Sequence, residues 1–175
     1  MATYNGISII PQNNWSSLDS VIATVACLVG CGGYCKTLGY FFHTKYPDDI
    51  LQHHFDINML ELLTISVALK LWGHALKGQR IQVYCDNLVS VYVINTGRAR
   101  HNNLIACLRE IAFICATSEI QLKAVHISSK SNRWADFLSR VEADAGNLQL
   151  FQKEIDFSAT DMVVDSKLFR FTADW

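Results

Sequence analysis

Three acidic residues are spaced along the chain so that their carboxylates could act together. Glu61 lies in the first turn of a segment with helical apolar periodicity, and Asp86 directly follows the strand-like run 81–85. Asp136 lies in a short helical pattern ten residues after His126. Hard divalent cations prefer oxygen ligands, and two such ions can activate a water molecule and neutralise a leaving phosphate oxygen. Converging carboxylates of this kind predict a Mg²⁺ (or Mn²⁺) site suited to phosphodiester hydrolysis.

Each acid also has a purely structural explanation. Asn58 and Glu61 have the spacing of a capping box, with Asn58 as the N-cap and Glu61 three positions later. Asp86 could cap the helix that follows it. Asp136 could pair with Arg140 one helical turn later. The sequence leaves these alternatives open for each acid taken singly.

The elements that would hold these residues follow the order β-β-(β)-α-β-α-α-β-α. Gly30-Cys-Gly-Gly33 is predicted to turn the first strand into the second, which gives an antiparallel hairpin. Helices and strands alternate after the hairpin, so the fold class is α/β, a mixed sheet that becomes parallel and is flanked by helices. The predicted strands cover 19–28, 34–43, 81–85 and 120–127, with a third short strand in or next to the loop 44–55, and the predicted helices cover 58–78, 88–95, 104–117 and 133–141.

Composition indicates one compact domain with short additions. The chain has 175 residues, of which 50% are hydrophobic and 18% are charged, so it can bury a core and is not disordered as a whole. Its net charge of −1 excludes binding to nucleic acid mainly through bulk positive charge. We divide the chain into a lead-in segment (1–18), a core domain (19–141) and a C-terminal tail (142–175) that either docks or is partly disordered.

The sequence gives no sign of secretion or of membrane insertion. The N-terminus lacks a basic region followed by an apolar stretch, and no segment approaches the ~20 apolar residues that cross a bilayer. We therefore expect an intracellular protein, cytoplasmic or nuclear, with no membrane partner. The six cysteines include no Cys-x-x-Cys pair, which favours reduced and mostly buried thiols over the alternatives of a disulfide or a zinc site.

The residues around the three acids resemble ribonuclease H. Three runs carry the resemblance, namely Ile57-Asn-Met-Leu-Glu-Leu-Leu63, Val83-Tyr-Cys-Asp-Asn87 and His126-Ile-Ser-Ser-Lys-Ser-Asn-Arg-Trp-Ala-Asp-Phe-Leu-Ser-Arg140. More narrowly, they are similar to the ribonuclease H domain that follows the reverse transcriptase in DIRS-like retrotransposons. The resemblance covers 20–141, and its last motif is specific because His, Asn and Asp keep the family's spacing.

The resemblance implies an RNase H-like fold and a Mg²⁺-dependent endonuclease that cuts the RNA strand of RNA–DNA hybrids. Glu61, Asp86 and Asp136 match three metal-binding carboxylates of the family. His126 matches a mobile-loop histidine that assists proton transfer or product release, and Asn132 matches a loop asparagine that helps to place that segment. The implied partners are a hybrid or another nucleic acid, together with the reverse transcriptase domain of a parent polyprotein.

The chain departs from the family pattern at one residue. Such domains usually read Thr-Asp-Ala on the first strand, whereas this chain reads Thr24-Val25-Ala26. Asp19 cannot replace the missing carboxylate because six residues of extended chain span ~20 Å. We therefore expect weakened metal binding and a lost or crippled activity. One alternative is a non-catalytic nucleic-acid-binding or scaffold domain of a decayed or domesticated element, and another is a related nuclease whose metals use a different acid.

Four further residues are candidates for substrate binding: Asn87, Arg98, Arg100 and Asn132. Arginine suits phosphate because its guanidinium can form two parallel hydrogen bonds. The alternative for Arg98 and Arg100 is a solvated loop between helices. The other cations are dispersed along the chain, so we expect the isolated domain to bind a hybrid weakly.

Overall fold

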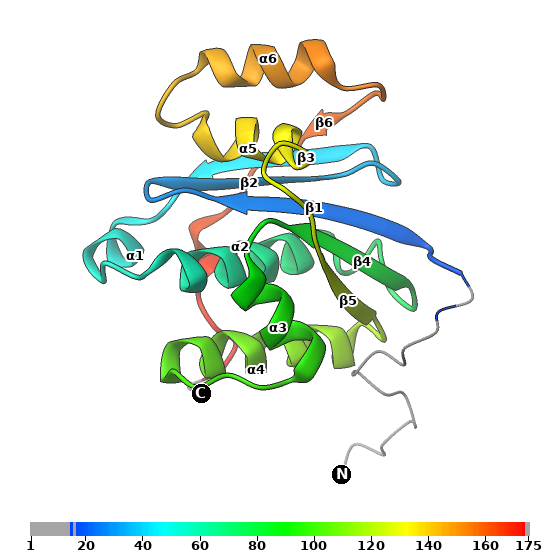
Figure 1. Ribbon diagram of the computed structural model, residues 1–175, viewed down its shortest axis with the longest axis vertical. Coiled ribbons are helices and arrows are strands. Elements are labelled where there is room, and N and C mark those ends of the chain that lie inside the picture. Colours follow the sequence, from blue (N-terminus) through cyan, green and yellow to red (C-terminus); the bar gives the residue numbers. More distant parts are fainter. Residues whose placement is uncertain (1–14, 16, 174–175) are drawn as a thin grey trace.

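The computed structural model describes residue 15 and residues 17–173, so most of the lead-in segment lies outside the described part. Its centre is a six-stranded mixed sheet with the order β5-β4-β1-β2-β3-β6 (Figure 1). The strands are β1 Ser20–Ala26, β2 Gly30–Cys35, β3 Tyr40–Lys45, β4 Arg80–Cys85, β5 Gln121–His126 and β6 Thr160–Asp161.

The strand directions are those of the predicted mixed sheet. β1 pairs antiparallel with β2, and β2 pairs antiparallel with β3. On its other side β1 pairs parallel with β4, which in turn pairs parallel with β5. The α/β prediction, a hairpin start followed by parallel strands, is therefore confirmed.

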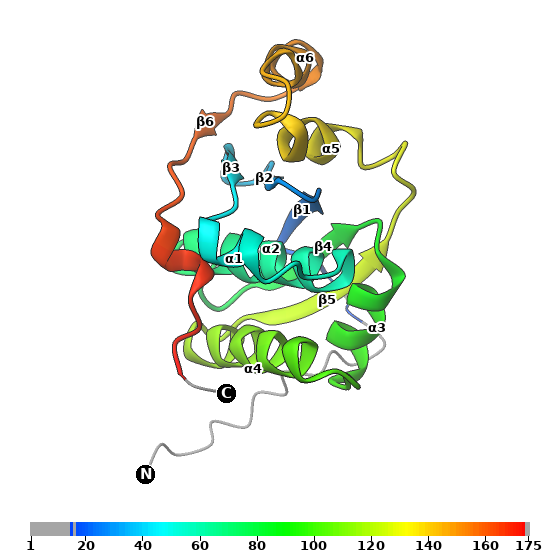
Figure 2. The ribbon, with the colours of Figure 1, turned by 90° about the vertical axis from the view of Figure 1, so that its left-hand side faces the viewer.

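Helices cover both faces of the sheet (Figures 1 and 2). One face carries the helices of the middle of the chain, and the other carries α5 and α6. The helices are α1 Asp48–Gln52, α2 Ile57–Trp72, α3 Leu88–Thr96, α4 Asn102–Thr117, α5 Arg133–Arg140 and α6 Gly146–Glu154. The core is centred on α2, which lies between the sheet and α4 and buries its side chains almost all round, as a helix enclosed on both sides must.

The predicted turn at residues 30–33 is wrong, because these glycines lie inside β2. The β1–β2 turn falls at residues 27–29, and Gly39, with a φ of 66°, helps to form the next turn. A Cβ atom on Gly32 would lie 2.5 Å from the Cβ of Leu138, so this glycine allows α5 to pack closely on the sheet. The predicted strand 34–43 is consequently two strands, β2 and β3, and the loop 44–55 contains α1 in place of a strand.

The start of the long helix also differs from the prediction. Asp56, and not Asn58, is the N-cap of α2, and its carboxylate accepts a hydrogen bond from the backbone N–H of Met59 at 2.9 Å. The Asn58 side chain instead accepts a hydrogen bond from Asn87 at 2.9 Å. The helix ends at Trp72, and turns continue to Gly78.

The C-terminal tail docks along the domain up to residue 173. After α6, β6 pairs parallel with β3, and the 3₁₀ turn Ser166–Phe169 packs beside α2 (Figure 2). The Lys70 ammonium lies 2.7 Å from the buried carboxylate of Glu110 and donates to backbone carbonyls of the tail, while Glu110 accepts two hydrogen bonds from Thr172. Within the described residues, none of the helices has the length and apolar character needed to cross a membrane.

Candidate active site

The candidate carboxylates gather where three parallel strands end. β1 ends at Ala26, β4 ends at Cys85 immediately before Asp86, and β5 ends at His126. Carboxyl ends of parallel strands share one edge of a sheet, and crevices form where the strand direction changes. Here that change occurs at β1, which is parallel to β4 and antiparallel to β2. The topology therefore brings the ends of these elements to one edge.

Glu61 is held by the backbone of β1. It is the fifth residue of α2, is 3% exposed, and its Oε1 accepts a hydrogen bond from the backbone N–H of Ala26 at 2.9 Å. Its Oε2 is buried and has no hydrogen-bond partner among the described residues. The pKa of Glu61 is raised to about 8, chiefly because the group is buried; the Ala26 N–H opposes this shift, and the charge of Asp86 adds to it. The capping-box explanation of Glu61 is therefore wrong, and at neutral pH this carboxyl group is mostly protonated.

Asp86 lies near both other acids. Its Oδ2 accepts a hydrogen bond from the Ser129 hydroxyl at 2.7 Å. It contributes to the raised pKa of Glu61, and also to the raised pKa of Arg140, which is caused first by Asp136. The explanation of Asp86 as a helix cap is wrong, because Asn87 is the N-cap of α3.

Asp136 forms the pair with Arg140 that its spacing predicts. Its Oδ1 accepts a hydrogen bond from the Arg140 Nε at 2.8 Å. The electrostatic coupling of Arg140 to Asp86 places this guanidinium at the same edge as the carboxylates. The site therefore contains a positive charge supplied by the chain itself.

Val25 faces α5 from the middle of the sheet. Its side chain is 4% exposed and belongs to a small apolar cluster with Ala23 and Ala135, against which Tyr84 packs. Ala135 directly precedes Asp136, and Val25 directly precedes the Ala26 amide that binds Glu61. Val25 is thus flanked by two of the three acids, and it presents only methyl groups to that space.

The two loop residues matched by the resemblance lie on either side of the site. His126 is exposed at the end of β5, and its register partner on β4 is Cys85. Asn132 is fully buried and donates from Nδ2 to the carbonyl of Thr24 at 3.0 Å, while its Oδ1 is buried without a partner in the described part of the chain. Asn132 therefore ties the loop before α5 to β1, one residue before Val25.

The other substrate-binding candidates fall into two places. The Asn87 side chain caps α3, accepting from the Ser90 N–H at 2.8 Å, and also donates to Asn58, so its polar atoms are in use. Arg98 and Arg100 lie together in the loop between α3 and α4 and line a pocket of about 300 Å³ beside the start of α2. Of the four candidates, Arg98 and Arg100 are exposed, whereas Asn87 is half-buried and Asn132 is buried.

The donor set does not fit a two-metal centre. Within the described residues, no three His, Cys, Asp or Glu side chains lie close enough together to hold a metal ion. Glu61 is mostly neutral at neutral pH, Asp136 is paired with Arg140, and valine occupies the β1 position where the resemblance implies a fourth carboxylate. We therefore derive no reaction step through a metal in this chain.

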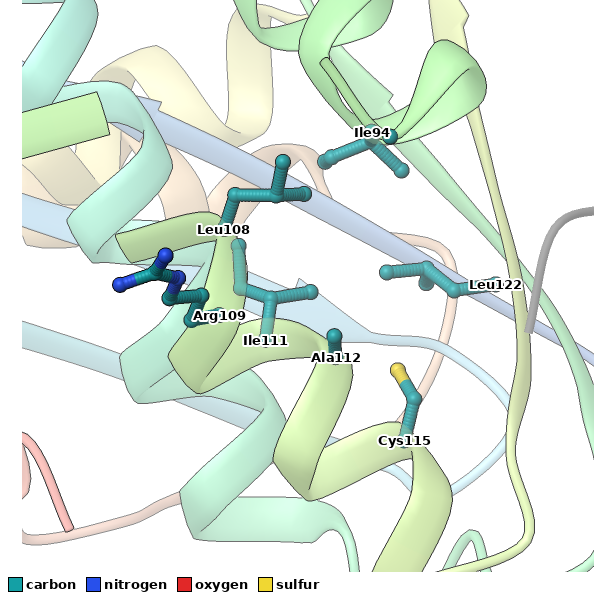
Figure 3. Close-up of a pocket in the computed structure, with 8 residues that line it drawn as sticks. Ile94, Leu108, Arg109, Ile111, Ala112, Cys115 and Leu122 are labelled. Atoms are coloured by element: carbon teal, nitrogen blue, oxygen red, sulfur yellow. The ribbon is translucent and has the colours of Figure 1, made fainter. Parts of the chain in front are cut away.

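Several contacts of the site carry no signal in the sequence. The Ser129–Asp86 hydrogen bond joins residues 43 positions apart, and the Cys27 thiol donates to the Ser139 carbonyl at 3.1 Å across 112 positions. Another pocket, of about 320 Å³, lies between α3, α4 and β5, with Leu108, Ile111 and Leu122 in its wall (Figure 3). None of the candidate carboxylates lines that pocket, so it is separate from the site.

Comparison with known proteins gives no assignment for the chain. A scan against models of protein families finds no match, and a search of curated proteins finds no significant match. The function therefore has to be argued from the residues and from their geometry.

Proposed function

We propose that this chain is the ribonuclease H domain of a DIRS-like retrotransposon reverse transcriptase, and that it has lost most or all of its ability to cut RNA–DNA hybrids. The observation that carries the proposal is the position of Val25. It is buried at the end of β1 against the residue preceding Asp136, and its neighbour Ala26 binds Glu61. Two of the three remaining acids of the family motif, Glu61 and Asp136, thus lie on either side of a side chain that can neither bind a cation nor accept a proton.

The loss of one carboxylate at this position is sufficient to explain inactivity. Phosphoryl transfer depends on charge neutralisation and on the placement of the attacking and leaving oxygens. Removing one well-placed group from such a site costs roughly 100- to 1,000-fold in rate. The raised pKa of Glu61 and the Arg140–Asp136 pair support the same conclusion, because both reduce the negative charge available to a Mg²⁺ or Mn²⁺ ion.

The remaining residues support positioning of a nucleic acid. Arg98 and Arg100 would contact backbone phosphates, and the buried Asn132 would hold the loop that follows His126 against β1. The reverse transcriptase domain of the parent polyprotein would supply most of the affinity, because the chain has a net charge of −1.

A second candidate is a non-catalytic nucleic-acid-binding or scaffold domain of a decayed or domesticated element. The paired exposure of Arg98 and Arg100 favours it, since these two cations line one pocket while no three possible metal ligands lie together in the described part of the chain. The two candidates differ in whether restoring a single carboxylate restores cleavage.

The test compares the natural chain with Val25→Asp on a labelled RNA–DNA hybrid in Mg²⁺ and in Mn²⁺. We expect cleavage of the RNA strand by Val25→Asp only. Val25→Asn is the matched control, because it has the shape of aspartate without the charge, and it should remain inactive. Circular dichroism and thermal unfolding of all three proteins establish that they are folded.

The remaining outcomes decide between the alternatives. Equal cleavage by the natural chain and by Val25→Asp would refute the role given to Val25 and favour a nuclease that uses another acid. Hybrid binding without cleavage by either protein would favour the second candidate. If neither protein binds or cuts the hybrid, both candidate functions are rejected.

A further inference from the structure

We propose that the sheet edge next to the candidate site is an interface between two copies of this chain. Of the ten exposed large hydrophobic side chains in the described part of the chain, six lie at this edge. We call these six residues the apolar face, and they are Leu28, Val29, Ile57, Leu88, Val89 and Tyr92. Contiguous exposed apolar surface of this kind marks interaction sites in soluble proteins.

The elements that carry the apolar face are adjacent in space. Leu28 and Val29 form the β1–β2 turn, Ile57 begins α2, and the other three residues occupy the first turns of α3. The hydrogen bond between Asn58 and Asn87 joins the start of α2 directly to the start of α3. The end of the molecule that carries this edge faces the viewer in Figure 2, where α1 and α3 lie on either side of it.

Two pockets indent the apolar face and give it a shape that side chains of a partner could fill. One, of about 230 Å³, lies between Leu28 and the residues Leu51 and Phe55. The other, of about 300 Å³, lies between Tyr92 and the loop that carries Arg98 and Arg100. Large apolar side chains seated in pockets supply most of the free energy of a protein–protein interface.

The chemistry of this face fits a protein better than a phosphate backbone. Leu28, Leu88 and Tyr92 are 70%, 67% and 57% exposed, and a surface that contacts phosphates is expected to present Lys and Arg at its centre instead. The two arginines that we propose to contact phosphates, Arg98 and Arg100, lie at the rim, so a hybrid and a second copy would compete for them. Protein interfaces, in contrast, have apolar centres with charged residues at their rim.

The charges at the rim identify the partner as a second copy. The exposed carboxylates Asp48 and Asp49 lie on α1 at one side of the face, and the exposed Arg98 and Arg100 lie beyond α3 at the other. None of these four side chains forms an ion pair with another part of the described chain. A twofold axis through the apolar centre brings the acidic side of each copy opposite the basic side of the other, so the face is complementary to itself.

The first experiment measures the molar mass by sedimentation equilibrium at low salt, over roughly two decades of protein concentration up to ~200 μM. We expect a concentration-dependent monomer–dimer equilibrium. Leu28→Glu and Leu88→Glu should each raise the dimer dissociation constant by at least ~10-fold. Leu150→Glu is the matched control, because Leu150 is 44% exposed on α6, away from the apolar face, and its replacement should leave the equilibrium unchanged.

The second experiment tests the charge pairing across the twofold axis. Arg98→Glu should weaken the dimer, and adding Asp49→Arg to it should restore association, because the signs of this one pair are then exchanged while Asp48 and Arg100 keep theirs. A chain that is monomeric at every concentration would overturn the proposal, as would equal weakening by Leu150→Glu. If the natural chain stays monomeric and a bound RNA–DNA hybrid protects α3 from hydrogen exchange, the face belongs to the nucleic acid instead.

Discussion

At the residue scale, Glu61 combines a buried carboxyl group with a single hydrogen bond to the backbone. Ionisation of Glu61 would lower the stability of the folded protein. It would bury a negative charge that, among the described residues, accepts a hydrogen bond from the Ala26 N–H alone. A purely structural residue at this position would be apolar or fully hydrogen-bonded. A buried and incompletely hydrogen-bonded carboxyl group is consistent with the functional role that we propose for Glu61.

The pH dependence of stability tests this description of Glu61. The unfolded chain ionises Glu61 near its ordinary pKa of 4.5, whereas the folded protein retains the proton up to about pH 8. Between these values the folded state binds more protons, so the free energy of unfolding contributed by this group falls as pH rises and levels off above pH 8. Glu61→Gln should remove that decrease, as measured by urea unfolding of both proteins at about pH 5 and about pH 8. Parallel pH profiles for the two proteins would contradict it.

Cysteine reactivity provides a second prediction at the residue scale. Burial raises the pKa of the Cys31, Cys85 and Cys115 thiols to about 12, and it also raises the pKa of Cys35 and Cys107. Cys27 is only half-buried, at the end of β1. Because the thiolate is the reactive form, iodoacetamide should modify Cys27 at least ~100-fold faster than the other five in the folded protein. Peptide mapping by mass spectrometry measures this, and rapid labelling that persists in Cys27→Ser would contradict it.

At the scale of elements, the regular patterns of the sequence predicted most of the fold. Apolar alternation and helical periodicity located β4, β5, α3, α4 and α5 to within two residues at each end. The predictions failed where a local sequence feature is explained by contacts with residues that are distant in the sequence. The glycines of β2 read as a turn, but Gly32 is required because α5 approaches the strand closely there, through Leu138, which lies more than 100 positions away in the sequence.

The candidate site was predictable only in part. The three acids and the Asp136–Arg140 pair follow from spacing and from the family motif. The position of Val25 against Ala135 and the burial of Glu61 depend on how α2 and α5 pack on opposite faces of the sheet, which no local pattern encodes.

The packing of α5 on β2 gives a prediction at this scale. In Gly32→Ala the new Cβ would overlap the Cβ and the backbone of Leu138, so α5 must move, at a cost of roughly 1–3 kcal/mol in the free energy of unfolding. Gly97→Ala is the control, because its Cβ meets open space and only its φ of 64° is unfavourable. Hydrogen exchange should accelerate in α5 for Gly32→Ala only. Unchanged protection of α5 would contradict the close-packing role of Gly32.

At the scale of the whole molecule, the C-terminal tail binds both layers together. It begins at the α5–α6 side, adds β6 to the sheet edge and reaches the α2–α4 side at Thr172. The ion pairs along this path include an exposed one between Lys36 and Asp156 and a buried one between Lys70 and Glu110.

These two pairs allow a matched comparison. Lys70→Met removes the ammonium beside the buried Glu110 carboxylate, which should lower the free energy of unfolding by roughly 3–5 kcal/mol. Lys36→Met removes an exposed pair and should change the free energy of unfolding much less. Chemical denaturation of both variants measures the difference. Equal decreases in the free energy of unfolding for the two variants would show that the buried pair does not hold the tail in place.

We propose that a single side chain, Val25, separates this chain from ribonuclease activity. The single-turnover rate of RNA cleavage in an RNA–DNA hybrid with Mg²⁺ tests this proposal, for the natural chain and for Val25→Asp at the same concentration. We expect Val25→Asp to be faster by at least ~100-fold and this gain to disappear when Asp86→Asn is added. Equal rates, or a gain that survives the loss of Asp86, would contradict it.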